Sequence, residues 1–161
     1  MYIMLILITG ISLIGCDPDN SPLGQPGTPP TPNPPSVPYP DPPATGNQIN
    51  IKVGTTTFTA TIEDNPTSAA FKSMLPLNIF MRELNNNEKY VDLQGNLPTN
   101  SYHPRTIQKG DIMLYGSNTL VLFYKTFTSP YSYTRIGRID NVSGLEAALG
   151  TGNINVTFNI Q

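Results

Sequence analysis

The distribution of proline is the feature that most constrains what this chain can fold into. Twelve of its 17 prolines lie between Pro18 and Pro43, and only five follow in the rest of the chain. Proline fixes φ and removes a backbone donor, so residues 16–48 are expected to form neither a helix nor a central strand. We predict a disordered, extended tether there, with a reach of about 3.1 Å per residue. Residues 49–161 have ordinary composition and are predicted to form one compact domain.

A short apolar run precedes the proline-rich tether. The run from Ile3 to Ile14 is too short to cross a bilayer core as a helix, which takes about 20 residues. Its length matches the apolar region of a signal peptide, and the sequence Leu13-Ile14-Gly15-Cys16 resembles a bacterial lipobox. The resemblance implies that residues 1–15 are cleaved and that the Cys16 thiol carries a diacylglycerol. The alternative is a buried strand with an ordinary core cysteine, but the prolines that follow would leave such a strand without a partner.

These features predict an extracytoplasmic lipoprotein of the bacterial cell envelope, anchored to a membrane through Cys16. Asp17 and Asp19 resemble sorting signals for inner-membrane retention and also those for surface export, so the membrane and leaflet stay open. A single cysteine excludes an internal disulfide framework. Only 12% of the residues are charged, the net charge is −2, and no basic patch is visible, so nucleic-acid binding is not expected.

About eight short strands are predicted between residues 49 and 161. Alternation of apolar and polar residues marks those at 49–53, 58–62, 77–81 and 154–160, and an apolar run marks 119–125, as in a strand covered on both faces. The others are expected at 88–93, 111–115 and 133–139. Two short helices are also predicted. Asn65-Pro66 has the pattern of a helix start, and Ser143 to Glu146 fits a capping box with Gly150 as the stop. Since strands and helices do not alternate regularly, a doubly wound sheet is unexpected, and a mainly β, closed antiparallel barrel is favoured.

The domain resembles the cyclophilin-like fold family of small bacterial domains. The resemblance rests on residues 64–71, 75–77, 87–90, 110–116, 120–124 and 131–139, which follow one another in the family's order. It implies an eight-stranded barrel with two helices. It implies no particular activity, because members of this small family mostly lack an assigned function.

The cyclophilin resemblance raises the question of peptidyl-prolyl isomerase activity. In isomerase cyclophilins an arginine hydrogen-bonds the prolyl nitrogen beside an aromatic pocket that also presents a tryptophan and a histidine. This chain has no tryptophan, and its single histidine, His103, lies in a predicted loop. Arg135 and Arg138 are the candidate arginines, and the candidate pocket walls are Tyr131, Tyr133, Phe123, Tyr124 and Phe127.

The two arginines are not equivalent as candidates. Side chains alternate along a regular strand, so Arg135 is expected on the face of Tyr133 and Arg138 on the opposite face with Ile136. Only one of them could then point into a given cleft, and we favour Arg135. The alternative is that both arginines pair with surface carboxylates and that the tyrosines line an ordinary barrel wall.

Other polar residues give weaker signals. Glu88-Lys89 is interpreted as a solvated turn pair, and Asp111 as the end of a turn. No metal site, cofactor or nucleophile–base pair is predicted. Three functions stay open: a membrane-tethered module that binds a peptide or small molecule near Arg135, a weak peptidyl-prolyl isomerase acting on envelope proteins, and a structural lipoprotein without a ligand.

Overall fold

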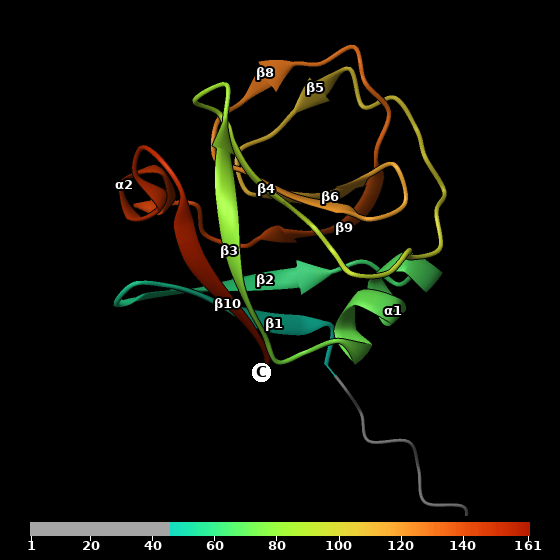
Figure 1. Ribbon diagram of the computed structural model, residues 1–161, viewed down its shortest axis with the longest axis horizontal. Coiled ribbons are helices and arrows are strands. Elements are labelled where there is room, and N and C mark those ends of the chain that lie inside the picture. Colours follow the sequence, from blue (N-terminus) through green and yellow to red (C-terminus); the bar gives the residue numbers. More distant parts are fainter. Residues whose placement is uncertain (1–45) are drawn as a thin grey trace, which may run out of the picture. The chain divides into compact units, whose positions relative to one another are not determined.

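The computed structural model describes residues 46–161 (Figure 1). The predicted signal segment, Cys16 and nearly all of the proline-rich tether lie outside the described residues, so those predictions stay predictions. The strands are β1 (Gln48–Val53), β2 (Thr56–Ile62), β3 (Leu77–Leu84), β4 (Glu88–Asp92), β5 (Thr106–Ile107), β6 (Asp111–Tyr115), β7 (Thr119–Phe123), β8 (Phe127–Thr128), β9 (Thr134–Ile139) and β10 (Ile154–Ile160). The helices are α1 (Pro66–Ser73) and α2 (Leu145–Leu149). Neither of these helices is long and apolar enough to cross a membrane.

Eight of these strands form a closed antiparallel barrel in the order β1-β10-β3-β4-β7-β6-β9-β2. This confirms the predicted fold, and each predicted strand corresponds to one strand of the barrel. Closure leaves no barrel strand with an unpaired edge. The two helices lie at different ends of the barrel, α1 beside β1 and β2 and α2 beside the loop into β10 (Figure 1).

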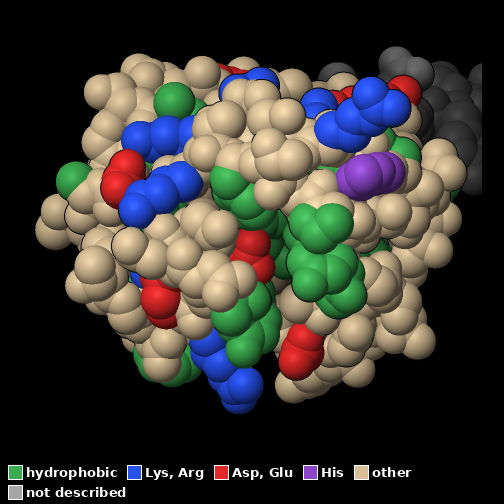
Figure 2. Space-filling view, turned by 90° about the horizontal axis from the view of Figure 1, so that it is seen from above, with side chains coloured by type: hydrophobic (Ala, Val, Ile, Leu, Met, Phe, Trp, Pro, Cys, Tyr) green, Lys and Arg blue, Asp and Glu red, His purple; other side chains and the backbone are tan. Residues whose placement is uncertain are grey.

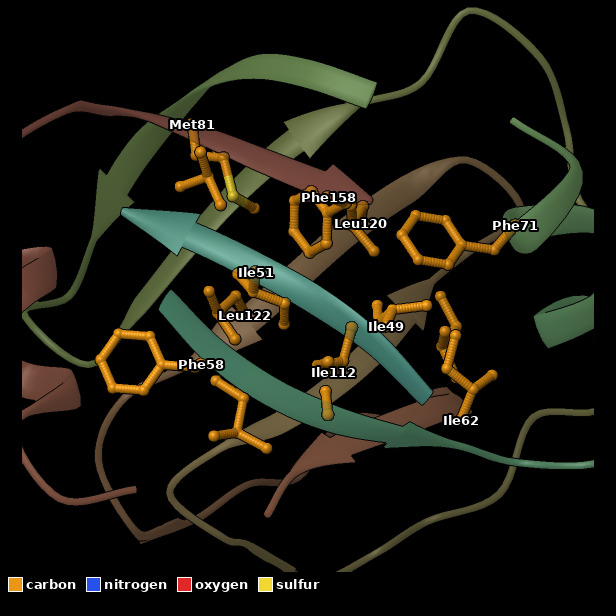
Figure 3. Packing of buried hydrophobic residues seen from close by; sticks show 14 of the residues in the cluster. Ile49, Ile51, Phe58, Ile62, Phe71, Met81, Ile112, Leu120, Leu122 and Phe158 are labelled. Atoms are coloured by element: carbon orange, nitrogen blue, oxygen red, sulfur yellow. The ribbon is translucent and has the colours of Figure 1, made fainter. Parts of the chain in front are cut away.

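The barrel interior is a continuous apolar core. On β1, for example, Ile49, Ile51 and Val53 are buried while Lys52 is exposed, as period-2 alternation predicts. Figure 3 shows these inward side chains meeting those of β7 and β10. Phe71 reaches in from α1, and its ring meets that of Phe158 edge-on with centroids 5.6 Å apart. Helix α1 therefore closes its end of the barrel with an aromatic plug.

The two helix starts differ in how well the sequence predicted them. At α1 the Asn65 side chain accepts a hydrogen bond from the backbone of Ser68 at 2.8 Å, which confirms the predicted N-cap. The prediction of a capping box at α2 is wrong. Its N-cap is Gly144 with φ 75°, and no side chain caps the helix. The Ser143 side chain therefore does not cap the helix, whereas the predicted stop at Gly150 is confirmed.

A second apolar cluster lies on the outer side of the barrel wall. Alternate residues of β6 and β7 point away from the core, and the loops on either side of β5 and β8 fold over them. The buried members are Ile107, Met113, Val121, Phe123 and Tyr133. Strands β5 and β8, only two residues each, pair with one another outside the barrel and hold this cover in place.

Strand β9 contains an irregularity that matters for the arginines. Against β6, Gly137 pairs with Ile112 but Arg135 pairs with Met113, so Ile136 is an extra residue on β9. Arg138 pairs with Asp111, which places it on the same outer face as Arg135. The expectation that Arg135 and Arg138 occupy opposite faces is therefore wrong, because a bulge shifts the alternation by one residue.

Candidate functional site

A pocket opens on the outer wall of the barrel over β4, β7 and β6. Outward positions recur every second residue on these strands, so Glu88, Tyr90 and Asp92 of β4 share one face with Thr119 and Val121 of β7. The segment after β8 forms the opposite wall. The pocket has a volume of about 420 Å³, and its aromatic members are Tyr90, Tyr115, Phe127, Tyr131 and Tyr133. We call it the aromatic pocket; its remaining lining residues are Leu84, Asn85, Glu88, Asp92, Thr119, Val121, Ser129 and Pro130.

The aromatic rings form a continuous series of contacts. The rings of Tyr131 and Tyr115 meet nearly at right angles, at 79° with centroids 5.9 Å apart, and Tyr115 meets Tyr133 at 5.6 Å. Behind them Phe123 packs edge-on against Tyr133 at 5.5 Å and contacts Phe127 at 5.7 Å. Tyr133 and Phe123 are thus fixed by packing, whereas Tyr131 is 56% exposed at the rim.

One carboxyl group lies among these rings. Glu88 is only 8% exposed, and burial, followed by repulsion from the nearby Glu83, raises its pKa from 4.5 to about 7. Within residues 46–161 its carboxylate makes no hydrogen bond or ion pair. Burial also raises the pKa of Tyr133, which lies close enough to Glu88 for the two charges to interact. The interpretation of Glu88-Lys89 as a solvated turn pair is therefore wrong, since both residues are buried on β4.

Figure 2 views the molecule from the side that carries β5 and β8 in Figure 1. Hydrophobic side chains gather around a hollow in the middle of this face, and acidic side chains are visible between them. Lys and Arg side chains are also visible around the apolar surface, so this face carries charges of both signs.

Arg135 lies in a different cavity. This second cavity, of about 540 Å³, is lined by the N-terminal end of α1 and by residues 98–102, together with Thr134 and Arg135. The Nε of Arg135 donates to the Tyr102 hydroxyl at 3.0 Å, and its guanidinium lies 5.9 Å from the centre of that ring. Arg135 shares a strand face with Tyr133 as expected, but its bond to Tyr102 holds it away from the aromatic pocket.

Arg135 and Arg138 both lie near the buried carboxylate of Asp111. Asp111 is fully buried, and one of its carboxylate oxygens accepts from the backbone of Gln108 at 2.9 Å. Arg135 Nη2 and Arg138 Nε lie 4.0 Å and 3.8 Å from the carboxylate. Asp111 ends a turn as predicted, since its backbone N–H donates to the carbonyl of Gln108 at 3.0 Å, and it is also the first residue of β6. Both arginines face this carboxylate, and Arg138 is half exposed.

Tyr124 belongs to neither cavity. It is buried directly after β7, and its hydroxyl donates to Glu83 at 2.8 Å. Burial and this hydrogen bond raise the Tyr124 pKa above its ordinary value of 10.0. Lys89 also pairs with Glu83, donates to the carbonyls of Gly150 and Gly152 at 3.0 and 2.6 Å, and lies 5.2 Å from the centre of the Tyr124 ring. This network ties the loop after α2 to the barrel.

Of the predicted site residues, the structure brings Tyr131, Tyr133 and Phe127 together in the aromatic pocket, with Phe123 behind them. His103 is exposed in a loop, where its ring contacts the carbonyl of Ser129 at 2.9 Å. Residues 46–161 contain no group of three or more His, Cys, Asp or Glu side chains that could hold a metal ion.

Comparison with known proteins identifies the family. The sequence model of the cyclophilin-like family matches residues 51–159, which is most of the described domain. The chain belongs to the cyclophilin-like family. A solved structure with a similar fold is the solution structure of the hypothetical protein AF2241 from Archaeoglobus fulgidus, with a TM-score of 0.50 and 16% sequence identity over 73% of this chain and 96% of that one. No curated protein matches the sequence.

Within this cyclophilin-like barrel, sequence reasoning missed Glu88 as a candidate site residue. The signal was present, because strand alternation over 88–92 places Glu88, Tyr90 and Asp92 on one face. What the sequence did not show is which face is covered by residues 127–131. That cover converts an exposed acidic face into a pocket with a buried carboxyl group.

Proposed function

We propose that this chain is an extracytoplasmic lipoprotein whose cyclophilin-like barrel binds a peptide or small molecule in the aromatic pocket. The observation that carries the binding proposal is a concave site that combines aromatic walls with a buried carboxyl group of raised pKa. Small-ligand sites have this general composition, in which apolar and aromatic walls surround a few polar groups. The rim residue Tyr131 is exposed and therefore accessible to a ligand.

The binding proposal is tested on the full chain in a non-ionic detergent. Nuclear magnetic resonance spectra would be recorded while small aromatic, aliphatic and ammonium compounds and a prolyl tetrapeptide are added in turn. We expect at least one probe to shift the ring signals of Tyr115, Tyr131 and Tyr133, and the shifts to weaken in Tyr131→Ala. If no probe perturbs these rings, the structural lipoprotein without a ligand becomes the better account.

Peptidyl-prolyl isomerase activity is the less supported alternative. It would need an arginine and an aromatic pocket in one cleft, and here Arg135 shares its cavity only with Tyr102, while the tyrosines of the aromatic pocket line another cavity. We therefore expect no acceleration in a protease-coupled isomerisation assay of the full chain. Acceleration that disappears in Arg135→Ala would instead favour the isomerase and move the site to the second cavity.

Membrane anchoring rests on the lipobox-like sequence that ends at Cys16. Two or more acyl chains on one protein hold it stably at a bilayer, whereas a single chain binds only marginally. We expect mass spectrometry of the mature protein to find Cys16 as the modified first residue. Cys16→Ser should move the protein from the membrane fraction to the soluble fraction. A mature chain that still carries residues 1–15 without a fatty acid would contradict this part of the proposal.

A further inference from the structure

The charge of the aromatic pocket points to one class of ligand. Its lining contains two carboxylates, Glu88 and Asp92, and, among the residues that the structure describes there, no Lys, Arg or His. The nearby cations have other partners, since Lys89 pairs with Glu83 and the guanidinium of Arg135 hydrogen-bonds Tyr102. An anion would meet only like charge in this pocket.

We propose that the aromatic pocket binds an alkylammonium group, with its positive charge held between the Glu88 carboxylate and the tyrosine rings. This inference deepens the proposed function, since it names the chemistry of the ligand for the same pocket. It rests on three independent observations, namely the unpartnered carboxyl group, the arrangement of the rings and the size of the cavity.

The carboxyl group of Glu88 has no positively charged partner within the described residues, and a bound cation would be one. More than nine-tenths of the residue is buried, and within residues 46–161 no donor binds its carboxylate. Its oxygens keep some contact with solvent in the pocket, since they are not among the fully buried unpartnered atoms of the described residues. Even this partial burial of a carboxylate without a partner is costly, and the group responds with a raised pKa. A cation placed beside it would compensate the lost hydration and favour the ionised form.

The rings provide the second part of a cation site. Tyr131 and Tyr115 stand nearly perpendicular, at 79°, so together they form a corner rather than a flat wall. Tyr133 continues this surface at 5.6 Å from Tyr115. The faces of aromatic rings attract cations within about 6 Å of the ring centre, and several rings around one ammonium group form the aromatic cages that bind quaternary ammonium ligands.

The cavity suits a compact head group. Its volume of about 420 Å³ can hold a trimethylammonium group or the end of a lysine side chain, but not a folded peptide segment. The ammonium group could thus belong to a free small molecule or to a lysine of an extended peptide. The chemistry at the pocket is the same for both sources, so the probes must separate them.

Binding should strengthen as the pH rises, because only ionised Glu88 attracts the cation. The other titratable groups lining the pocket or acting on Glu88 are acids or phenols, namely Glu83, Tyr90, Asp92, Tyr115, Tyr124, Tyr131 and Tyr133, and the adjacent Lys89 is paired with Glu83 on the core side of β4. None of the groups that line the pocket becomes cationic at any pH. With a Glu88 pKa of about 7, ionisation changes most between pH 6 and pH 8. Choline should therefore bind about tenfold more weakly at pH 6 than at pH 8.

The experiment compares three probes on the full chain in non-ionic detergent by titration calorimetry and tyrosine resonances. Choline carries a quaternary ammonium, 3,3-dimethylbutan-1-ol has nearly the same shape without the charge, and Nα-acetyl-lysine N-methylamide presents the ammonium as a peptide would. We expect choline to bind at least about tenfold more tightly than the neutral alcohol. Tighter binding of the lysine derivative than of choline would identify a peptide as the source, and the reverse order a small molecule.

Two variants make the test specific to Glu88. Glu88→Gln keeps the shape and removes the charge, so it should abolish both the preference for choline over the alcohol and the pH dependence. Glu63→Gln removes an exposed carboxylate that lines the second cavity and should change neither. If choline and the alcohol bind equally to the pocket, the cation inference fails and the proposed function stands. If neither ammonium probe nor any other compound perturbs the tyrosine rings, both fail.

Discussion

The residue that most distinguishes this barrel is Glu88. Its position on β4 is a plain consequence of strand alternation, yet its environment depends on residues about 40 positions later that fold over it. A carboxyl group with a folded-state pKa of about 7 makes the stability of the protein sensitive to pH in the neutral range. This can be tested without a ligand.

We expect Glu88→Gln to change the pH dependence of stability. Because the pKa of Glu88 is raised from 4.5 to about 7 on folding, the folded protein keeps a proton in this range that the unfolded chain has released. The associated stabilisation is fully present below pH 4.5 and is lost as the pH rises through about 7. Its size is on the order of 3 kcal/mol. The variant should therefore be more stable than the wild type at pH 8, and the difference should shrink at pH 5.

Urea denaturation of both proteins at pH 5 and pH 8 measures this effect. Glu63→Gln is the matched control, because Glu63 is exposed and lies outside the aromatic pocket. It should retain the pH dependence of the wild type. Parallel stability curves for Glu88→Gln and the wild type would show that Glu88 is hydrated in the folded state.

At the scale of elements, the bulge on β9 decides where the arginines point. Next to this bulge, Gly137 lies very close to the backbone of β2. A Cβ atom built on Gly137 would lie 2.5 Å from the carbonyl oxygen of Thr61 and 3.0 Å from the Cα of Ile62. Both are backbone atoms of a paired strand, so they cannot move aside as a flexible side chain would.

Gly137→Ala should therefore lower the stability of the domain by about 1–3 kcal/mol, the usual cost of forcing an extra methyl group into a packed site. Gly95→Ala is the control, since nothing lies within 4 Å of a Cβ at Gly95. Thermal unfolding followed by circular dichroism compares the two variants. Equal melting temperatures for Gly137→Ala and the wild type would mean that β2 and β9 are less closely packed in solution.

The elements also show how far the sequence could predict the structure. All eight barrel strands were predicted from local patterns such as alternation and the apolar run of β7, and Asn65-Pro66 marked the start of α1. Strands β5 and β8 contain two residues each, too few to show a period. The bulge at Ile136 and the left-handed Gly144 depend on neighbouring segments, so the face of Arg138 and the start of α2 were predicted wrongly.

The candidate site shows the same contrast between local patterns, which the sequence predicts, and long-range contacts, which it does not. Tyr131 and Tyr133 were predicted from a resemblance to cyclophilins, and they do lie together in one pocket. Arg135 instead lines the second cavity, where it contacts Tyr102, a loop residue 33 positions away, and the buried Asp111. Long-range contacts of this kind leave no periodic trace in the sequence, so the composition of each cavity could not be read from it.

At the scale of the whole domain, two apolar clusters share the same strands. On β6, Ile112 and Leu114 face the barrel core while Met113 faces the outer cluster, and on β7 Leu120 and Val121 divide in the same way. Every barrel strand and both helices contribute to the core, β4 through the partly buried Val91. The core and the outer cluster should therefore unfold together, since neither can lose its strands without the other.

Phe71→Ala tests this coupling from the far side of the core. Phe71 is fully buried and packs against Phe158, so its truncation should cost about 3–5 kcal/mol. Far-ultraviolet circular dichroism follows the barrel strands, and tyrosine fluorescence follows chiefly the rings around the outer cluster. Both signals should move to the same lower urea midpoint, because one cooperative transition gives coincident curves. Tyr131→Ala, at the exposed rim, should leave the midpoint nearly unchanged. A tyrosine transition that stays at the wild-type midpoint in Phe71→Ala would show that the aromatic pocket is a separately stable unit.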